Sequence, residues 1–201
     1  MTDISKWKIV LYLAAIFAAG VGLDQWSKYQ AVARLTDLFR RIGADTLGER
    51  LRAFLSYRHL ESLSTEPYPV FRPLWRMIYV ENPNAAFGLG NFLSDGPRLA
   101  IFVVAASAAA VAVVYYYRKL DADRRFHQVA LALVLAGDVG NLIDRALRRY
   151  VIDFVDWHWW NRPDLRWPTF NVADSMLVVG VALLLLKPFP SKAEPPDAGK
   201  P

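Results

Sequence analysis

The segment FNVADSMLVVGVALLLL, residues 170–186, joins a polar cluster directly to an apolar run. The run from Met176 onward contains no polar side chain, whereas Asn171 and Asp174 stand just before it. An ionisable group beside hydrocarbon is costly, so in a membrane protein such a residue is by default a functional hypothesis. Asp174 is therefore the first candidate functional residue of this chain.

The composition indicates a membrane protein. The chain has 201 residues, 54% of them hydrophobic and seven of them Trp, and its mean hydropathy is +0.17, which is too apolar for an ordinary soluble domain of this length. Four apolar stretches predict transmembrane helices. Their approximate bounds are residues 8–25, 98–117, 127–145 and 171–187. The apolar parts of the first, third and fourth are short, so flanking residues or local thinning of the bilayer must complete those spans.

An alternative for the first stretch is the apolar core of a secretory signal peptide, since its length and the small residues that follow are suitable. Against this, Asp24, Gln25 and Lys28 come directly after it. Three further predicted spans also make removal of the first one unexpected.

Basic residues predict the orientation. The loop RKLDADRR between the second and third spans carries Arg118, Lys119, Arg124 and Arg125, and the positive-inside rule puts it in the cytoplasm. Both termini then lie in the cytoplasm, although the basic loop after the third span fits the rule less well. We expect residues 1–189 to form a single membrane domain that includes an extracytoplasmic arm at residues 29–97. The proline-rich residues 190–201 are expected to form a disordered cytoplasmic tail.

The arm contains two stripes of apolar residues at helical spacing. They are Leu35, Leu38, Phe39 and Ile42, followed by Leu47, Leu51, Phe54 and Leu55. Because arginines lie among them, one interpretation is an amphipathic helix on the outer membrane surface, and the other is packing on the protein's own loops.

Two strand-like segments complete the expected fold. RMIYVE, residues 76–81, and YVIDFVDW, residues 150–157, are rich in β-branched and aromatic residues. The predicted fold class is a mainly α membrane protein with four transmembrane helices, a small extracytoplasmic β-sheet and an amphipathic extracytoplasmic arm.

Four polar clusters lie where predicted spans meet loops. Asp24 and Lys28 share a helix face, and Asp138, Asn141 and Arg145 share another. ENPNAAFGLG follows residue 80, and Asn171 and Asp174 open the last span. In the predicted topology all four clusters lie on the outer side, whereas simple helix caps would be expected at both ends of the spans. They therefore predict one functional site.

The sequence excludes several kinds of chemistry. It has no cysteine, which removes thiol catalysis, disulfides and cysteine metal sites. His59, His127 and His158 show no metal-ligand spacing, so no metal and no cofactor is expected. A four-span transport or proton-conducting protein is an alternative, but a conduction pathway should place polar residues throughout the membrane, and the second and fourth spans are almost wholly apolar.

Five motifs in series resemble lipoprotein signal peptidase, the bacterial type II signal peptidase. They are DQWSK at 24–28, NPNAAFG at 82–88, GNLIDR at 140–145, VIDF at 151–154 and FNVADS at 170–175. The resemblance implies a four-helix aspartyl endopeptidase of the bacterial inner membrane, active near the periplasmic face. It also implies cleavage of prolipoproteins just before a diacylglyceryl-modified cysteine. The implied partners are that substrate and membrane lipid, with no nucleic acid, and the protein is expected to be monomeric.

The resemblance also assigns roles to residues. It places the catalytic aspartates on Asp153 and Asp174, and it treats Asp144 as structural support. The substrate-binding residues that it implies are Asp24, Lys28, Asn82, Asn141, Arg145 and Asn171. Two nearby carboxyl groups cannot both ionise easily, so such a pair shares a proton and can supply both an acid and a base.

The chain departs from the family pattern at two positions. Asn84 stands where the family usually has a glycine, and Asp138 is an additional carboxylate on the face of Asn141 and Arg145. Pairing with Arg145 is one explanation for Asp138, and an altered site is the other. These departures leave open a catalytically silent paralogue that binds lipoprotein precursors.

Overall fold

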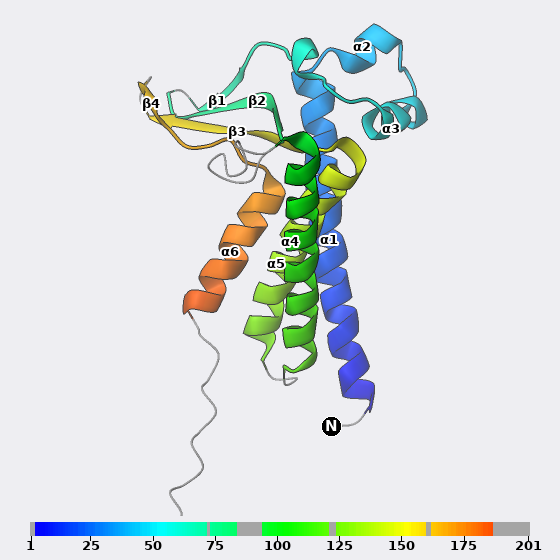
Figure 1. The fold of residues 1–201 in the computed structure, drawn as a ribbon, viewed down its shortest axis with the longest axis vertical. Coiled ribbons are helices and arrows are strands. Elements are labelled where there is room, and N and C mark those ends of the chain that lie inside the picture. The colour runs from blue at the N-terminus through cyan, green and yellow to red at the C-terminus, as the bar shows by residue number, and fades with distance from the viewer. Residues whose placement is uncertain (1–2, 72, 84–93, 121–123, 160–161, 187–201) are drawn as a thin grey trace, which may run out of the picture.

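Long helices carrying a small sheet at one end make up the molecule (Figure 1). The computed structural model describes residues 3–71, 73–83, 94–120, 124–159 and 162–186. The long helices are α1 (Asp3–Leu35), α4 (Asp95–Arg118), α5 (Arg125–Arg148) and α6 (Val172–Leu186). The N-terminal end of α1 lies at the end of the bundle away from the sheet.

Helix α1 continues to Leu35, past residue 25 where the sequence predicts the end of the first span. The residues in between, QWSKYQAVARL, contain neither proline nor glycine and are mostly compatible with a helix. The predicted start of the arm at residue 29 therefore lies inside α1. Asp24 and Lys28 are consequently mid-helix residues rather than terminal ones.

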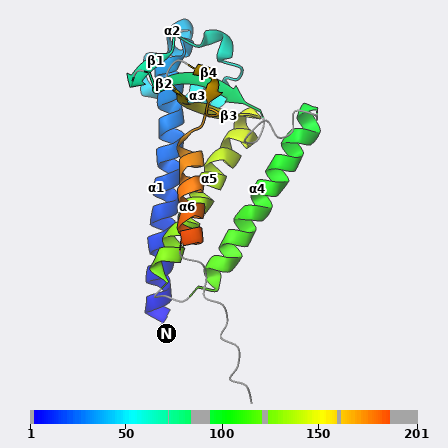
Figure 2. The same ribbon diagram turned by 90° about the vertical axis from the view of Figure 1, so that its left-hand side faces the viewer.

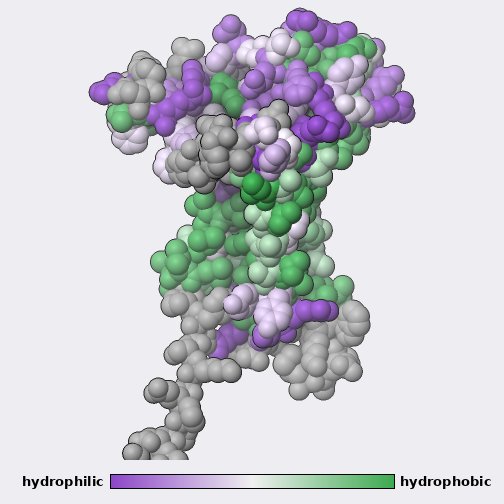
Figure 3. All heavy atoms as spheres, in the orientation of Figure 1, coloured by the Kyte–Doolittle hydropathy of each residue, from purple (hydrophilic) through white to green (hydrophobic). Residues whose placement is uncertain are grey.

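Within the described residues, three helical segments are long and apolar enough to cross a membrane, namely Val10–Leu35, Gly96–Arg118 and Arg125–Arg148. Helix α6 is apolar but has 15 residues, a length of about 22 Å at 1.5 Å per residue. Figure 3 shows a hydrophobic band over the helices, with hydrophilic residues above it on the sheet and arm and a smaller hydrophilic group below it. This distribution is that of a membrane protein.

Glycines bring α5 and α6 into close contact. A Cβ atom added at Gly137 would lie 2.4 Å from the carbonyl oxygen of Ala173, and one at Gly180 would lie 2.7 Å from Cγ2 of Val134. Small residues at such crossings allow two helix backbones to approach. Helix α4 instead leans away from α1 and α6 and is farthest from them near the sheet (Figure 2).

In the part of the chain that the structure describes, the sheet has four antiparallel strands in the order β1-β2-β3-β4. They are β1 (Tyr68–Phe71), β2 (Trp75–Asn82), β3 (Val151–Trp159) and β4 (Arg162–Arg166). The two strands predicted at residues 76–81 and 150–157 are thus confirmed as the central pair. Asn82 lies opposite Val151, and Val80 lies opposite Asp153, so the sheet brings two predicted site residues together.

The arm folds against the C-terminal end of α1 as α2 (Leu38–Ile42), α3 (Leu47–Ser56) and the short helix η1 (Glu61–Leu63). Leu35, Leu38 and Phe39 belong to the hydrophobic core, whereas Ile42 is exposed. For this first stripe the packing interpretation is therefore confirmed for three of its four residues.

Candidate active site

Asp153 occupies the middle of a polar cluster between the sheet and the helices. Its side chain is buried on β3, 1% exposed. Oδ2 accepts a hydrogen bond from Nδ2 of Asn82 at 2.9 Å, and Oδ1 accepts one from Nδ2 of Asn171 at 2.8 Å. Burial, reinforced by the neighbouring Asp174 carboxylate, raises the pKa of Asp153 to about 7. This carboxyl group can hold a proton near neutral pH.

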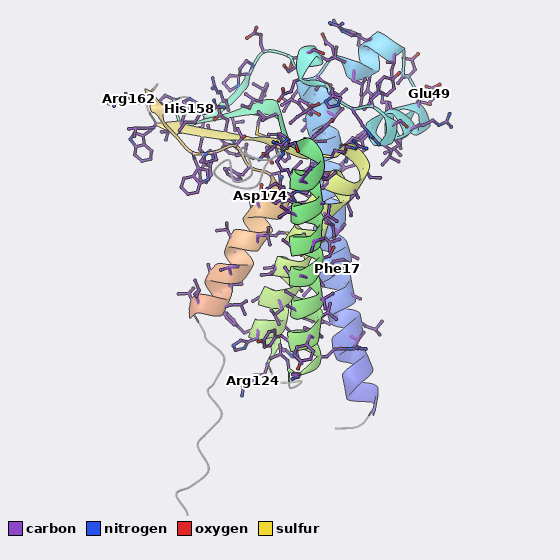
Figure 4. The ribbon with its side chains drawn as sticks, in the orientation of Figure 1. Phe17, Glu49, Arg124, His158, Arg162 and Asp174 are labelled. Carbon is purple, nitrogen blue, oxygen red and sulfur yellow. The ribbon has the colours of Figure 1, made fainter. Side chains whose placement is uncertain are left out.

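Asp174 lies in the first turn of α6, at the junction of the helices and the sheet (Figure 4). Its Oδ2 accepts a hydrogen bond from the backbone N–H of Asn171 at 3.1 Å, and its own backbone N–H donates to Oδ1 of Asn171 at 3.0 Å. This reciprocal pair is a capping box, which explains locally why an Asn three residues before an Asp begins the helix. Oδ1 of Asp174 also accepts a hydrogen bond from Nδ2 of Asn141 at 2.8 Å.

Asn171 connects the two carboxyl groups. Its side-chain amide donates to Asp153, while its backbone N–H donates to Asp174. The same amide nitrogen lies 3.2 Å from both Oδ1 of Asn141 and the carbonyl oxygen of Ile152. A single fully buried side chain thus holds β3, α5 and the start of α6 in one arrangement.

Behind this pair lies a fully buried ion network centred on Lys28. Its Nζ is 2.8 Å from Oδ2 of Asp24, 2.9 Å from Oδ2 of Asp144 and 3.0 Å from Oδ1 of Asn141. Neither Lys28 nor its two carboxylate partners has exposed side-chain surface. Buried charges of this kind must be paired and hydrogen-bonded.

The remaining contacts of the two carboxylates connect the network to other elements. Oδ1 of Asp24 accepts a hydrogen bond from the backbone N–H of Ala173 at 3.0 Å. Asp144 accepts one from Arg148 at 2.7 Å and one from the backbone N–H of Ile152 at 3.1 Å. Asp24 and Lys28 therefore reach the carboxyl pair through Asn141 and the start of α6, and the contacts of Asp144 are those of structural support.

Arg145 lies on the same helix as Asn141 but points toward α4. Its Nη1 donates to the backbone oxygen of Asn141 at 3.4 Å, and its guanidinium lies 5.6 Å from the ring centroid of Phe102. Among the described residues, Oδ2 of Asp138 is buried without a hydrogen-bond partner. Within the described residues, Asp138 and Arg145 do not form a salt bridge with each other.

The structure brings the eight predicted site residues into one region formed by α1, β2, α5, β3 and α6. Asn84 lies outside the described residues. The sequence interpretation missed Gln25, whose amide donates to Asp24 and Asp144, and Arg148. The sequence spacing could have indicated the ion pair of Arg148 with Asp144, because the two residues are four apart on one helix.

Comparison with known proteins agrees with this geometry. The family model described as "Signal peptidase (SPase) II" matches residues 16–189. A lipoprotein signal peptidase from Anaeromyxobacter sp. is 58% identical over 94% of this chain and 88% of its own length. Another, from Geobacter sulfurreducens, is 43% identical over 58% of this chain and 69% of its own length.

Solved structures give the same result for the fold. Two structures described as a bacterial membrane enzyme superpose with TM-scores of 0.62 and 0.60, at 27% and 28% identity. Each superposition covers 87% of this chain, and 85% and 90% of the two solved chains. The family match over most of the sequence and the agreement in fold establish that this chain belongs to the signal peptidase II family.

Proposed function

We propose that Asp153 and Asp174 are the catalytic pair of this enzyme. As a member of its family, the protein is an aspartic-type signal peptidase that removes signal peptides from prolipoproteins. The observation that supports the assignment best is that Asn171 joins the two carboxyl groups, one of which has a pKa of about 7.

The proposed mechanism uses the pair in its singly protonated state. Protonated Asp153 donates a hydrogen bond to the carbonyl oxygen of the scissile peptide, and ionised Asp174 accepts a proton from the attacking water. The C–O bond forms as that proton moves to Asp174, which gives a tetrahedral intermediate. The intermediate breaks at the C–N bond, and the proton is returned to the leaving amine. No metal or cofactor enters this sequence of steps.

The surrounding polar residues are proposed to bind and orient the substrate. Asn82, Asn141 and Asn171 hold the carboxyl groups in place, and Arg145 can contact a substrate backbone carbonyl between α4 and α5. Asp24 and Lys28 contribute from the buried network by positioning Asn141 and the start of α6.

The proposed cleavage point is the bond before a diacylglyceryl-modified cysteine. We further propose that the enzyme is a monomer in the bacterial inner membrane, with α6 as a fourth span, both termini in the cytoplasm and the site near the periplasmic face. The position of the carboxyl pair at the sheet end of an apolar helix bundle supports this arrangement, because a lipid-modified cysteine lies at the membrane edge. Contact with membrane lipid follows from the exposed apolar surface of the helices.

Substitution of each aspartate tests the assignment. Asp153→Asn and Asp174→Asn keep the side-chain size but remove proton exchange, so each should slow cleavage of a diacylglyceryl-modified precursor by roughly 100-fold or more. Since the two residues act as a unit, the double variant should be little worse than either single one. Purified protein is assayed with the lipidated precursor and with the same precursor lacking lipid.

Two control carboxylates make the test specific. Asp45 is exposed in the arm, and Asp45→Asn should keep parental turnover. Asp156 is buried on β3 between Arg76 and Arg166, so Asp156→Asn should lower stability while folded enzyme keeps most of its activity. Turnover within a few-fold of the parent in either Asp153→Asn or Asp174→Asn contradicts the assignment. Equal loss in Asp156→Asn would also contradict it.

A further inference from the structure

Helix α3 carries an apolar stripe that the described residues leave largely exposed. Leu47, Leu51 and Leu55 recur every four residues and are 61%, 41% and 52% exposed. The helix is well formed, because Thr46 and Glu49 make a capping box at its start. Phe54 and Ala53 on a neighbouring face are buried. The stripe is therefore additional to the face by which α3 packs on the protein.

The side of α3 opposite to the leucine stripe faces α2 and the segment that joins α2 to α3. A shallow hollow there is lined by residues of α3, the end of α2 and the segment between them. These are Ile42, Gly43, Ala44, Glu49, Arg52, Ala53, Ser56 and Tyr57. Figure 1 shows α2 farther from the helix bundle than α3. At 100° per residue, the leucine stripe lies on the side of α3 opposite to this hollow, so it faces toward the membrane-spanning part of the molecule.

The height of α3 along the bundle is set by Phe54. Arg148, the last residue of α5, donates a hydrogen bond at 3.0 Å to the carbonyl oxygen of Phe54, and its guanidinium lies 4.1 Å from the Phe54 ring centroid. Phe54 also packs edge-on against Tyr29 of α1, whose ring stacks on Trp26 at 5.3 Å. Trp26 is 53% exposed, and tryptophans are enriched at the membrane–water interface. Helix α3 therefore lies level with residue 148, where the candidate membrane span of α5 ends.

Exposed arginines flank α3 in the chain. Arg41 precedes the helix and Arg58 follows it, and basic side chains beside an interfacial helix attract anionic lipid. A helix with an apolar stripe, basic neighbours and a position at the interface has the properties of an interfacial membrane helix.

We propose that α3 is a membrane anchor of the arm, with Leu47, Leu51 and Leu55 inserted among the lipids of the outer leaflet. The anchor ties the arm, and the sheet packed beneath it, to the bilayer surface. This inference concerns lipid contact by α3 and does not depend on the catalytic assignment, because its test does not measure cleavage.

The absence of native cysteine allows a direct test. A polarity-sensitive fluorophore is attached to Leu51→Cys and, as a matched control on the opposite side of the same helix, to Ser56→Cys. The full-length protein is reconstituted in vesicles of phosphatidylcholine and phosphatidylglycerol with a spin-labelled lipid quencher, or with aqueous iodide. The spin-labelled lipid should quench the Leu51 probe roughly twofold or more strongly than the Ser56 probe. Aqueous iodide should instead quench the Ser56 probe more strongly than the Leu51 probe.

Two results would overturn the proposal. One is equal quenching of the two probes by lipid and by iodide, which would place the stripe in water. The other is that neither quencher reaches the Leu51 probe and that this shielding disappears when the protein is diluted in lipid. That result would mean that a second copy of the protein covers the stripe. Leu55→Cys repeats the measurement at another stripe position in case labelling at Leu51 impairs folding.

Discussion

At the scale of single residues, the environment of Asp153 determines how easily its carboxyl group ionises. Its carboxyl group is nearly completely buried, accepts hydrogen bonds from two amides and lies beside a second carboxylate. Burial raises its pKa, and the hydrogen bonds from Asn82 and Asn171 lower it, with burial the largest contribution. The balance leaves a group that can act as an acid at neutral pH.

This pKa predicts how activity depends on pH. Cleavage should fall as the pH rises through about 7, because the last shared proton of the pair is then lost. Asn82→Leu removes a donor that favours the ionised form, so the alkaline limb of the kcat profile should move to higher pH. An unchanged limb in Asn82→Leu, measured with lipidated precursor, would argue against Asp153 as the titrating group.

The same shift has a consequence for stability. The pKa of Asp153 is higher in the folded protein than its ordinary value of 3.8, so folding favours the protonated form. The resulting stabilisation is complete below about pH 4 and is lost as the pH rises through about 7. The Tm of Asp153→Asn, measured relative to the parent, should therefore rise between pH 5 and pH 8.

At the scale of helices, the contact between α5 and α6 positions the proposed catalytic groups. Gly137 lies against Ala173, the residue before Asp174. Gly137→Ala would force α6 away from α5, and overpacking of this kind costs about 1–3 kcal/mol. We expect a lower Tm together with reduced cleavage, because Asp174 moves with α6.

Gly22→Ala is the matched control for this prediction. It replaces a helical glycine in α1 where an added Cβ atom would meet nothing within 4 Å. Alanine stabilises a helix relative to glycine, so stability should not fall and cleavage should be unchanged. If both alanine variants behave alike in thermal unfolding and cleavage assays, the packing explanation is wrong.

At the scale of the whole molecule, the hydrophobic band separates two polar ends, and the carboxyl pair lies at the end that carries the sheet (Figures 3 and 4). The proposed topology puts this end outside the cytoplasm. Glu66→Cys in the arm should react with a membrane-impermeant thiol reagent added from outside. Lys119→Cys, after α4, should react only when the reagent reaches the cytoplasmic side. Labelling of both positions from the same side would contradict the orientation.

The sequence by itself determined the features that depend on local composition. Apolar runs identified the long helices, β-branched and aromatic residues identified β2 and β3, and the Asn171–Asp174 spacing is sufficient for the capping box that begins α6. The five motifs were also enough to select the candidate residues, because each motif is contiguous in the chain.

Only the tertiary structure decided which faces and which distant groups meet. It placed Lys28 between Asp24 and Asp144, and Asn171 between Asp153 and Asp174. It also buried Leu35, Leu38 and Phe39 while leaving the leucines of α3 exposed. Both stripes have the same helical period, and a period specifies an apolar face without specifying its partner. The partner is determined when segments far apart in the chain pack together, since burial and charge pairing depend on the surfaces that those segments present to each other.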